Sequence, residues 1–124
     1  MKKQEKEVLE KAAHGVQFES GKSAIKKASF SVLNEIVMIL NNNPTATLIV
    51  NGHTDNVGKP AANMLLSENR AIAVKKYLLD AGIDESRIKA SGYGDTQPLV
   101  PNTTKANKEK NRRVEFIVKY KTVE

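Results

Sequence analysis

Two charged residues, Asp55 and Arg70, offer the pair of groups that proteins use to hold an amino-acid head group. Asp55 lies just past a short apolar run, and ligands in α/β sheets gather where strands run out into loops. An arginine presents a fork of donors to a carboxylate, and an aspartate accepts from an ammonium group. The two residues therefore predict either a site for a zwitterion or a plain ion pair within the fold.

Other chemistries find little support in the residue types. The only histidines are His14 and His53, which excludes a multi-histidine metal site, and a site of His53 with Asp55 would need further ligands. The chain has no cysteine, which excludes disulfides, zinc–thiolate sites and thiol catalysis. No Gly-x-Ser-x-Gly nucleophile motif is present. We therefore expect no catalytic residues, no metal and no cofactor.

The elements that must position Asp55 and Arg70 follow from the hydrophobic pattern. We expect strands at 15–18, 47–50, 87–93 and 112–120, helices at 29–42 and 61–81, and a loop over 94–110. The first helix has Leu33, Ile36, Val37 and Leu40 at helical spacing, and Pro44 follows its end. The strand–helix–strand order favours a right-handed crossover. In the turn before Asp55, Gly52 lets the backbone bend or approach a neighbour closely.

The helix expected at 61–81 carries polar residues on the face that should lie on the sheet. At helical spacing, one face holds Leu66, Ala73, Val74, Tyr77, Leu78 and Ala81, together with Asn63, Ser67 and Arg70. A second, weaker apolar line lies opposite and consists of Leu65, Ile72 and Leu79. An arginine on a buried face is costly unless it meets an anion.

Arg112 raises the same question at the start of the last strand. It has the parity of Val114 and Phe116, which predicts that it points toward the core. Two inward arginines at element ends, Arg70 and Arg112, favour a polar pocket. The alternative is that both only close salt bridges within the fold.

The composition leaves the partner open. The net charge of +6 fits either a soluble basic surface or attraction to a polyanion, such as nucleic acid, anionic lipid or acidic glycan. Three Tyr, three Phe and no Trp give little support to base stacking, so a nucleic-acid-binding domain is only a remote alternative. No apolar run reaches the length of a membrane span, and residues 1–13 predict a charged helical linker or extension.

Three longer motifs carry a family resemblance. They are Gly52-His53-Thr54-Asp55-Asn56-Val57-Gly58, Asn63-Met64-Leu65-Leu66-Ser67-Glu68-Asn69-Arg70-Ala71 and Asn111-Arg112-Arg113-Val114-Glu115-Phe116. Gly82-Ile83, Arg87-Ile88, Gly92-Tyr93-Gly94, Pro98 and Asn102 stand between them. In order and spacing, the stretch from about Val16 to Val118 resembles the OmpA C-terminal domain family, which includes flagellar motor protein B and peptidoglycan-associated lipoprotein. We therefore expect one such domain at 14–124.

The resemblance implies a fold, a ligand and a location. The fold is an α/β (α+β) two-layer sandwich with a mixed four-stranded sheet packed against helices, in the order β-α-β-α-β-β. The function is non-covalent, non-enzymatic binding of peptidoglycan through the diaminopimelate of its stem peptide, which anchors an envelope or outer-membrane protein to the wall from the periplasm. Any attachment to the membrane would come from an anchor elsewhere in the parent protein.

The resemblance also assigns roles to residues. Asp55 and Arg70 hold the diaminopimelate, Asn63 and Arg112 take the positions of two further family motif residues, and Thr54, Leu66 and Ser67 line the pocket. The sequence departs from the family at Glu19, where aspartate is usual, at Gly21, where some relatives have a polar side chain, and at Asn107-Lys108, where Gly-Arg is usual. The alternative is an envelope module that forms homo-oligomers or other contacts and keeps only a vestigial amino-acid pocket.

Overall fold

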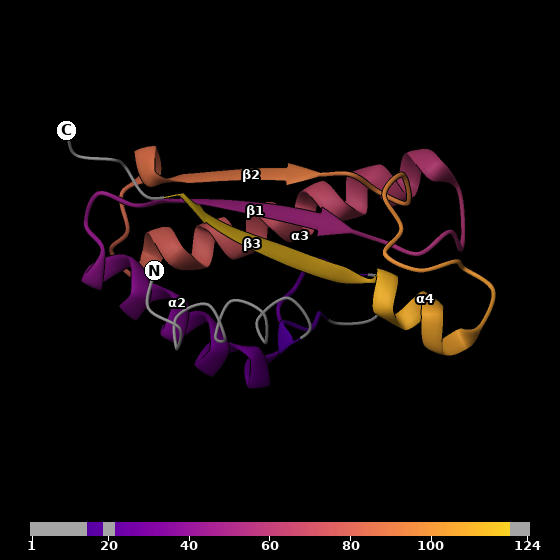
Figure 1. Cartoon of the computed structure of the whole chain (residues 1–124), viewed down its shortest axis with the longest axis horizontal. Helices are drawn as coiled ribbons and strands as arrows, with labels where there is room; N and C mark the ends of the chain where they lie inside the picture. Colours follow the sequence, from indigo (N-terminus) through magenta and orange to yellow (C-terminus); the bar gives the residue numbers. More distant parts are fainter. Residues whose placement is uncertain (1–14, 19–21, 120–124) are drawn as a thin grey trace.

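The computed structural model describes residues 15–18 and 22–119, and its centre is a three-stranded mixed sheet (Figure 1). The strand order is β2-β1-β3, with β1 (Thr47–His53) in the middle. β2 (Ile88–Gly92) pairs with β1 in parallel, and β3 (Arg113–Lys119) pairs with it antiparallel. The parallel pair is joined through a helix. The crossover predicted across 15–18, 29–42 and 47–50 does not form in this sheet, because residues 15–18 add no strand to it.

Helices cover the sheet face on which the alternate residues Leu48 and Val50 lie, and both of these are fully buried. α3 (Pro60–Asp80) packs along β1 and β2, and α2 (Phe30–Asn42) packs against α3 (Figure 1). Short 3-10 turns, η1 (Lys27–Ser29) and η2 (Glu85–Arg87), precede α2 and β2. No helix among the described residues combines the length and the apolar character that crossing a membrane requires.

α2 confirms the helix predicted at 29–42. Leu33, Ile36 and Leu40 are buried as expected, and Ile39 is buried beside them. The predicted fourth position, Val37, is partly buried against the same core. The helix ends where Asn43 and Pro44 follow it, because proline cannot continue a helical hydrogen-bond pattern.

α3 confirms the second predicted helix, and its buried residues lie within or beside the predicted face. Its buried residues are Asn63, Ser67, Ala71, Val74 and Leu78. Of the predicted stripe, Leu66 is only partly buried and Ala81 is exposed beyond the helix end. Small side chains lie on the buried face because the sheet comes very close: a Cβ added to Gly52 would lie 2.3 Å from the Ser67 carbonyl oxygen. The close approach predicted for Gly52 is therefore confirmed.

Two predictions about the sheet and its connections were wrong. Residues 15–18 add no strand to this sheet, because Phe18 makes only an isolated antiparallel bridge to Ile25. The segment 94–110 is not all loop, since α4 (Lys105–Asn111) forms there with Thr104 as its N-cap. Residues 1–13, Glu19, Gly21 and Tyr120 lie outside the described residues.

Candidate functional site

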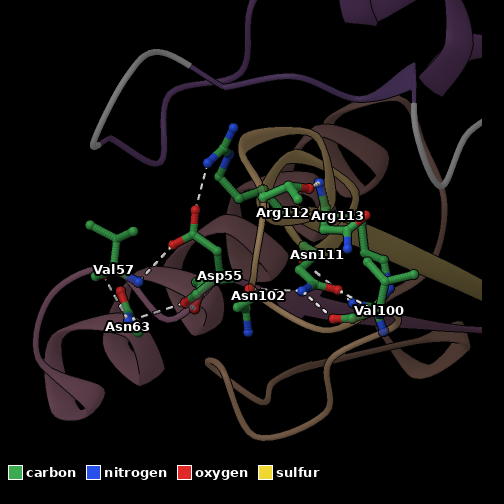
Figure 2. Close-up of polar contacts among 11 residues, drawn as sticks. Asp55, Val57, Asn63, Val100, Asn102, Asn111, Arg112 and Arg113 are labelled. Atoms are coloured by element: carbon green, nitrogen blue, oxygen red, sulfur yellow. Dashed lines mark hydrogen bonds and ion pairs between the residues drawn. The ribbon is translucent and has the colours of Figure 1, made fainter.

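Asp55 lies two residues beyond β1, with its side chain only 8% exposed. Its Oδ2 accepts a hydrogen bond from Arg112 Nη1 at 2.5 Å, and its Oδ1 accepts one from the Val57 backbone N–H at 2.9 Å (Figure 2). The ion-pair partner of Asp55 is therefore Arg112 and not Arg70. A carboxylate that is buried, paired and bonded to the backbone is held in one orientation.

Thr54 and Asn63 fix the loop that carries Asp55. Asn63 Nδ2 donates to the backbone carbonyls of Asp55 at 3.3 Å and Val57 at 3.1 Å (Figure 2). The Thr54 N–H donates to the Gly94 carbonyl at 2.8 Å, and the Thr54 hydroxyl donates to the Asp55 carbonyl at 2.8 Å. Both residues are buried and hold the Asp55 backbone in place.

Ser67 links α3 to the loop that follows β2. Its hydroxyl accepts from the Gly94 N–H at 2.8 Å and donates to the Met64 carbonyl at 2.8 Å, and the residue is fully buried. Leu66 beside it is half-buried. Among the predicted pocket residues, Ser67 therefore lies beneath the loops, where it fixes their spacing from α3.

Arg70 lies on α3 near both Asp55 and Arg112. Its Nε donates to the Lys22 carbonyl at 3.1 Å, and its guanidinium carbon lies 5.0 Å from the centre of the Phe18 ring, a cation–π arrangement. Burial lowers the pKa of Arg70, the positive charge of Arg112 lowers it further, and the negative charge of Asp55 raises it. Within the described residues, no carboxylate lies within 4.0 Å of this guanidinium, so Arg70 is a partly buried cation with no ion-pair partner there.

The expectation that Arg112 points into the core was wrong, because the strand begins one residue later. Arg112 is the C-cap of α4, and its side chain is 45% exposed. Arg113 is the buried one: it donates to Glu115 at 3.2 Å and to the carbonyls of Asn111 at 3.3 Å and Gln97 at 3.1 Å. Arg112 closes a salt bridge onto Asp55, one of the two arrangements that the sequence left open.

Asn111 is a buried residue whose structural role the sequence reasoning missed. Its Oδ1 accepts from the backbone N–H groups of Leu99 and Val100, and its Nδ2 donates to the Val100 carbonyl and to Asn102 Oδ1, all between 2.8 and 3.1 Å (Figure 2). A fully buried amide with four partners fastens the 99–102 loop to the end of α4. The signal was present, because Asn102 and Asn111 both belong to the quoted family pattern.

A cleft of about 830 Å³ opens beside this cluster. The described residues that line it are Val16, Gln17, Phe18, Lys26, His53, Arg70, Ala106, Glu109, Lys110, Arg112, Arg113 and Val114. Of the seven predicted site residues, Arg70 and Arg112 line the cleft, and Asp55 reaches it through its bond to Arg112. Thr54, Asn63, Leu66 and Ser67 do not line it.

His53 lies at the back of the cleft in a buried polar network. Its Nε2 lies 2.9 Å from Glu115 Oε1, and its ring stacks on Tyr93 with centroids 5.5 Å apart. Burial lowers the pKa of His53, the charge of Arg113 lowers it further, and Glu115 opposes both effects. Glu115 therefore joins His53 to Arg113 and holds the first residue of β3 against the end of β1.

Known proteins share both the sequence and the fold. The chain is 39% identical to outer membrane porin F of Pseudomonas fluorescens and 34% identical to peptidoglycan-binding protein ArfA of Mycobacterium bovis. Each match covers 83% of this chain and 32% of the relative, so the chain spans about a third of the length of these curated relatives.

The crystal structure of a putative MotB-like protein from Desulfovibrio vulgaris superimposes with a TM-score of 0.80 at 31% identity. That match covers 88% of this chain and 73% of the other. The mixed sheet with its helices is therefore shared with a solved structure. A model of the OmpA family matches residues 17–112, most of the chain. The chain belongs to the OmpA family.

Proposed function

We propose that this domain binds peptidoglycan non-covalently by holding the free amino-acid head of diaminopimelate in the stem peptide. The observation that carries the proposal is that Arg70 and Arg112 both line the cleft, that Asp55 is paired with Arg112, and that the charges of Asp55 and Arg112 both act on Arg70. One fixed carboxylate and two guanidinium groups supply an acceptor for an ammonium and donors for a carboxylate. The name of the ArfA relative, a peptidoglycan-binding protein, supports the same ligand.

Binding in this scheme exchanges one ion pair for two. Before binding, Asp55 accepts from Arg112, and Arg70 bonds to a backbone carbonyl through Nε. The ligand ammonium takes the place of Arg112 at Asp55, and the ligand carboxylate receives Arg70 together with the displaced Arg112. No buried charge is left without a partner, which is the condition for charges to be tolerated in a partly buried site.

The scheme predicts selectivity for diaminopimelate over lysine in the stem peptide. A lysine side chain brings an ammonium group but no carboxylate, so Arg112 would be displaced while Arg70 gains nothing. Calorimetry with two purified stem peptides that differ only at this residue is the direct measurement. We expect the lysine peptide to bind at least about tenfold more weakly, the size of one charge-assisted hydrogen bond. Equal affinities would contradict the proposal.

Sacculus pull-down tests the residues themselves. Asp55→Asn and Arg70→Gln each remove one charge of the site, and we expect neither variant to sediment with insoluble sacculi. Lys89→Gln, an exposed change on β2 outside the cleft, is the control and should sediment like the unchanged protein. Each variant must first show an unchanged circular dichroism spectrum. Sedimentation of a folded Arg70→Gln variant would reject the site.

The proposed role of this binding is to attach an envelope protein to the wall as a binding module without catalytic activity. The matched relatives include an outer membrane porin, of which this domain corresponds to about a third. A periplasmic location follows from the proposed ligand, because peptidoglycan lies there in bacteria with an outer membrane. Fractionation of cells that express the parent protein, with detection of the domain in the sacculus-bound fraction, tests this role.

A further inference from the structure

The cleft carries more positive charge than one amino-acid head group uses. Its charged lining among the described residues consists of Lys26, Arg70, Lys110, Arg112, Arg113 and Glu109. Arg112 is already paired with Asp55 and Arg113 with Glu115, and in the proposed scheme a single ligand carboxylate engages Arg70 and Arg112. Lys26 and Lys110 then remain, with Glu109 as the only acid in the described lining.

These two lysines come from different segments that border the same cavity. The backbone N–H of Lys26 donates to the Gln17 carbonyl oxygen at 2.8 Å. Lys110 lies on α4, where Ala106, Glu109 and Lys110 share one helical face, spaced by three and four residues, toward the cleft. Both lysine residues are exposed, so their ammonium groups reach solvent at the cleft margin. Ala106 lines the same cleft, and its small side chain takes up little of the space there.

The cleft is also larger than a single amino-acid head group requires. A volume of about 830 Å³ falls within the range of roughly 300–1,000 Å³ that pockets for drug-sized molecules occupy. A guest whose amino-acid head lies at Asp55 and Arg70 therefore has room to continue along the cleft. Lys26 and Lys110 line the same cleft and are the cationic side chains there that a second anionic group of the guest could engage.

We propose that the cleft, taken as the peptidoglycan site argued above, recognises a second free carboxylate on the stem peptide through Lys26 and Lys110. The glutamate that precedes diaminopimelate is joined through its side chain and so keeps an α-carboxylate. Amidation of that group removes its charge and hardly changes its size. The domain therefore discriminates between wall peptides with free and with amidated glutamate.

The test uses two synthetic tripeptides with an identical diaminopimelate residue and either a free or an amidated glutamate α-carboxylate. We expect the amidated peptide to bind about fivefold more weakly by calorimetry, the upper range for a solvent-exposed ion pair. The difference should shrink at high ionic strength, because salt screens charges at a cleft margin. In the double variant Lys26→Gln/Lys110→Gln, both peptides should bind with the same, weaker affinity.

Neighbouring lysines provide the matched control. The double variant Lys27→Gln/Lys108→Gln makes the same change in net charge from the same two segments, but neither residue lines the cleft. It should keep the full preference for the free carboxylate. If both tripeptides bind the unchanged protein equally well, the second-carboxylate inference is wrong and the diaminopimelate site stands. If neither binds, both proposals fall together.

Discussion

The ion pair between Asp55 and Arg112 joins a buried carboxylate to a guanidinium that is nearly half exposed. The Asp55 side chain is 8% exposed and the Arg112 side chain 45%, across a separation of 2.5 Å. Arg112 can turn into water at little cost, whereas Asp55 has no comparable route. The carboxylate is therefore the fixed half of the pair and the guanidinium the movable half, which is what a ligand that displaces Arg112 requires.

The difference in exposure between Asp55 and Arg112 predicts unequal losses of stability when either charge is removed. Arg112→Gln leaves a buried carboxylate without its cation and should lower the free energy of unfolding by about 1–3 kcal/mol, since an unpaired buried charge carries its full desolvation cost. Asp55→Asn leaves an exposed arginine and should cost less than about 1 kcal/mol. Urea unfolding followed by circular dichroism measures both. The ordering would be refuted by an Asp55→Asn variant that is less stable than Arg112→Gln.

Gly52 lies where the sheet and α3 approach each other very closely. In Gly52→Ala the new Cβ would meet the Ser67 carbonyl oxygen at 2.3 Å, and neither backbone can yield easily. We expect a loss of about 3 kcal/mol in the free energy of unfolding, the size of a core overpacking. Gly15→Ala is the control, because its nearest neighbour would be a Val32 methyl group at 3.5 Å. Chemical denaturation that gives equal midpoints for the two variants would contradict the contact.

Asn111 should contribute more to stability than its hydrogen-bond partner Asn102. Asn111→Ala removes four hydrogen bonds to the 99–102 loop and leaves their backbone partners unsatisfied, so we expect a loss of about 2–4 kcal/mol. Asn102→Ala, which removes one of the four, should cost about 1 kcal/mol or less. Limited proteolysis should cut Asn111→Ala within the loop first. An uncut loop in a destabilised variant would place the loss elsewhere.

His53 makes the stability of the domain depend on pH. Its pKa in the folded protein is lowered from 6.5, by burial first and by Arg113 second. The unfolded chain therefore binds a proton more readily, so this contribution is complete above about pH 6.5 and is lost as the pH falls toward the folded pKa. Urea unfolding at pH 7.5, 6.5 and 5.5 should show the decline, and His53→Gln should reduce its slope. Parallel slopes in the two proteins would exclude His53 as the cause.

The sequence predicted the elements with strong apolar periodicity and missed the polar one. α2 and α3 were found because apolar residues recur at helical spacing and Pro44 and Gly82 end them. α4 has the sequence Lys-Ala-Asn-Lys-Glu-Lys-Asn, which offers no apolar stripe. Its one local signal was Thr104, which caps the helix by accepting from the Asn107 N–H at 3.1 Å. A short helix held by Asn111 through tertiary bonds leaves little trace in a periodicity pattern.

The same limit explains why the orientation of Arg112 and the ion-pair partner of Asp55 were not predicted. Parity along the last strand assigned the inward position to Arg112, but α4 extends to Asn111 and delays the strand to Arg113. The position of Asp55 just beyond β1 was predictable from the short apolar run at 47–50, although β1 continues through Gly52 to His53. The choice of Arg112 over Arg70 as its partner was not, because it depends on how two distant segments meet.

The cleft takes its walls from residues 16–18 near one end of the chain, from Arg70 in the middle, and from 106–114 near the other end. A ligand bound in the cleft therefore contacts segments from both ends of the domain. Such a ligand binds only the folded protein, because no shorter stretch of the chain forms the cleft. It therefore raises the free energy of unfolding. Ligand binding and the stability of the fold are thus linked, so unfolding of either wall of the cleft weakens binding.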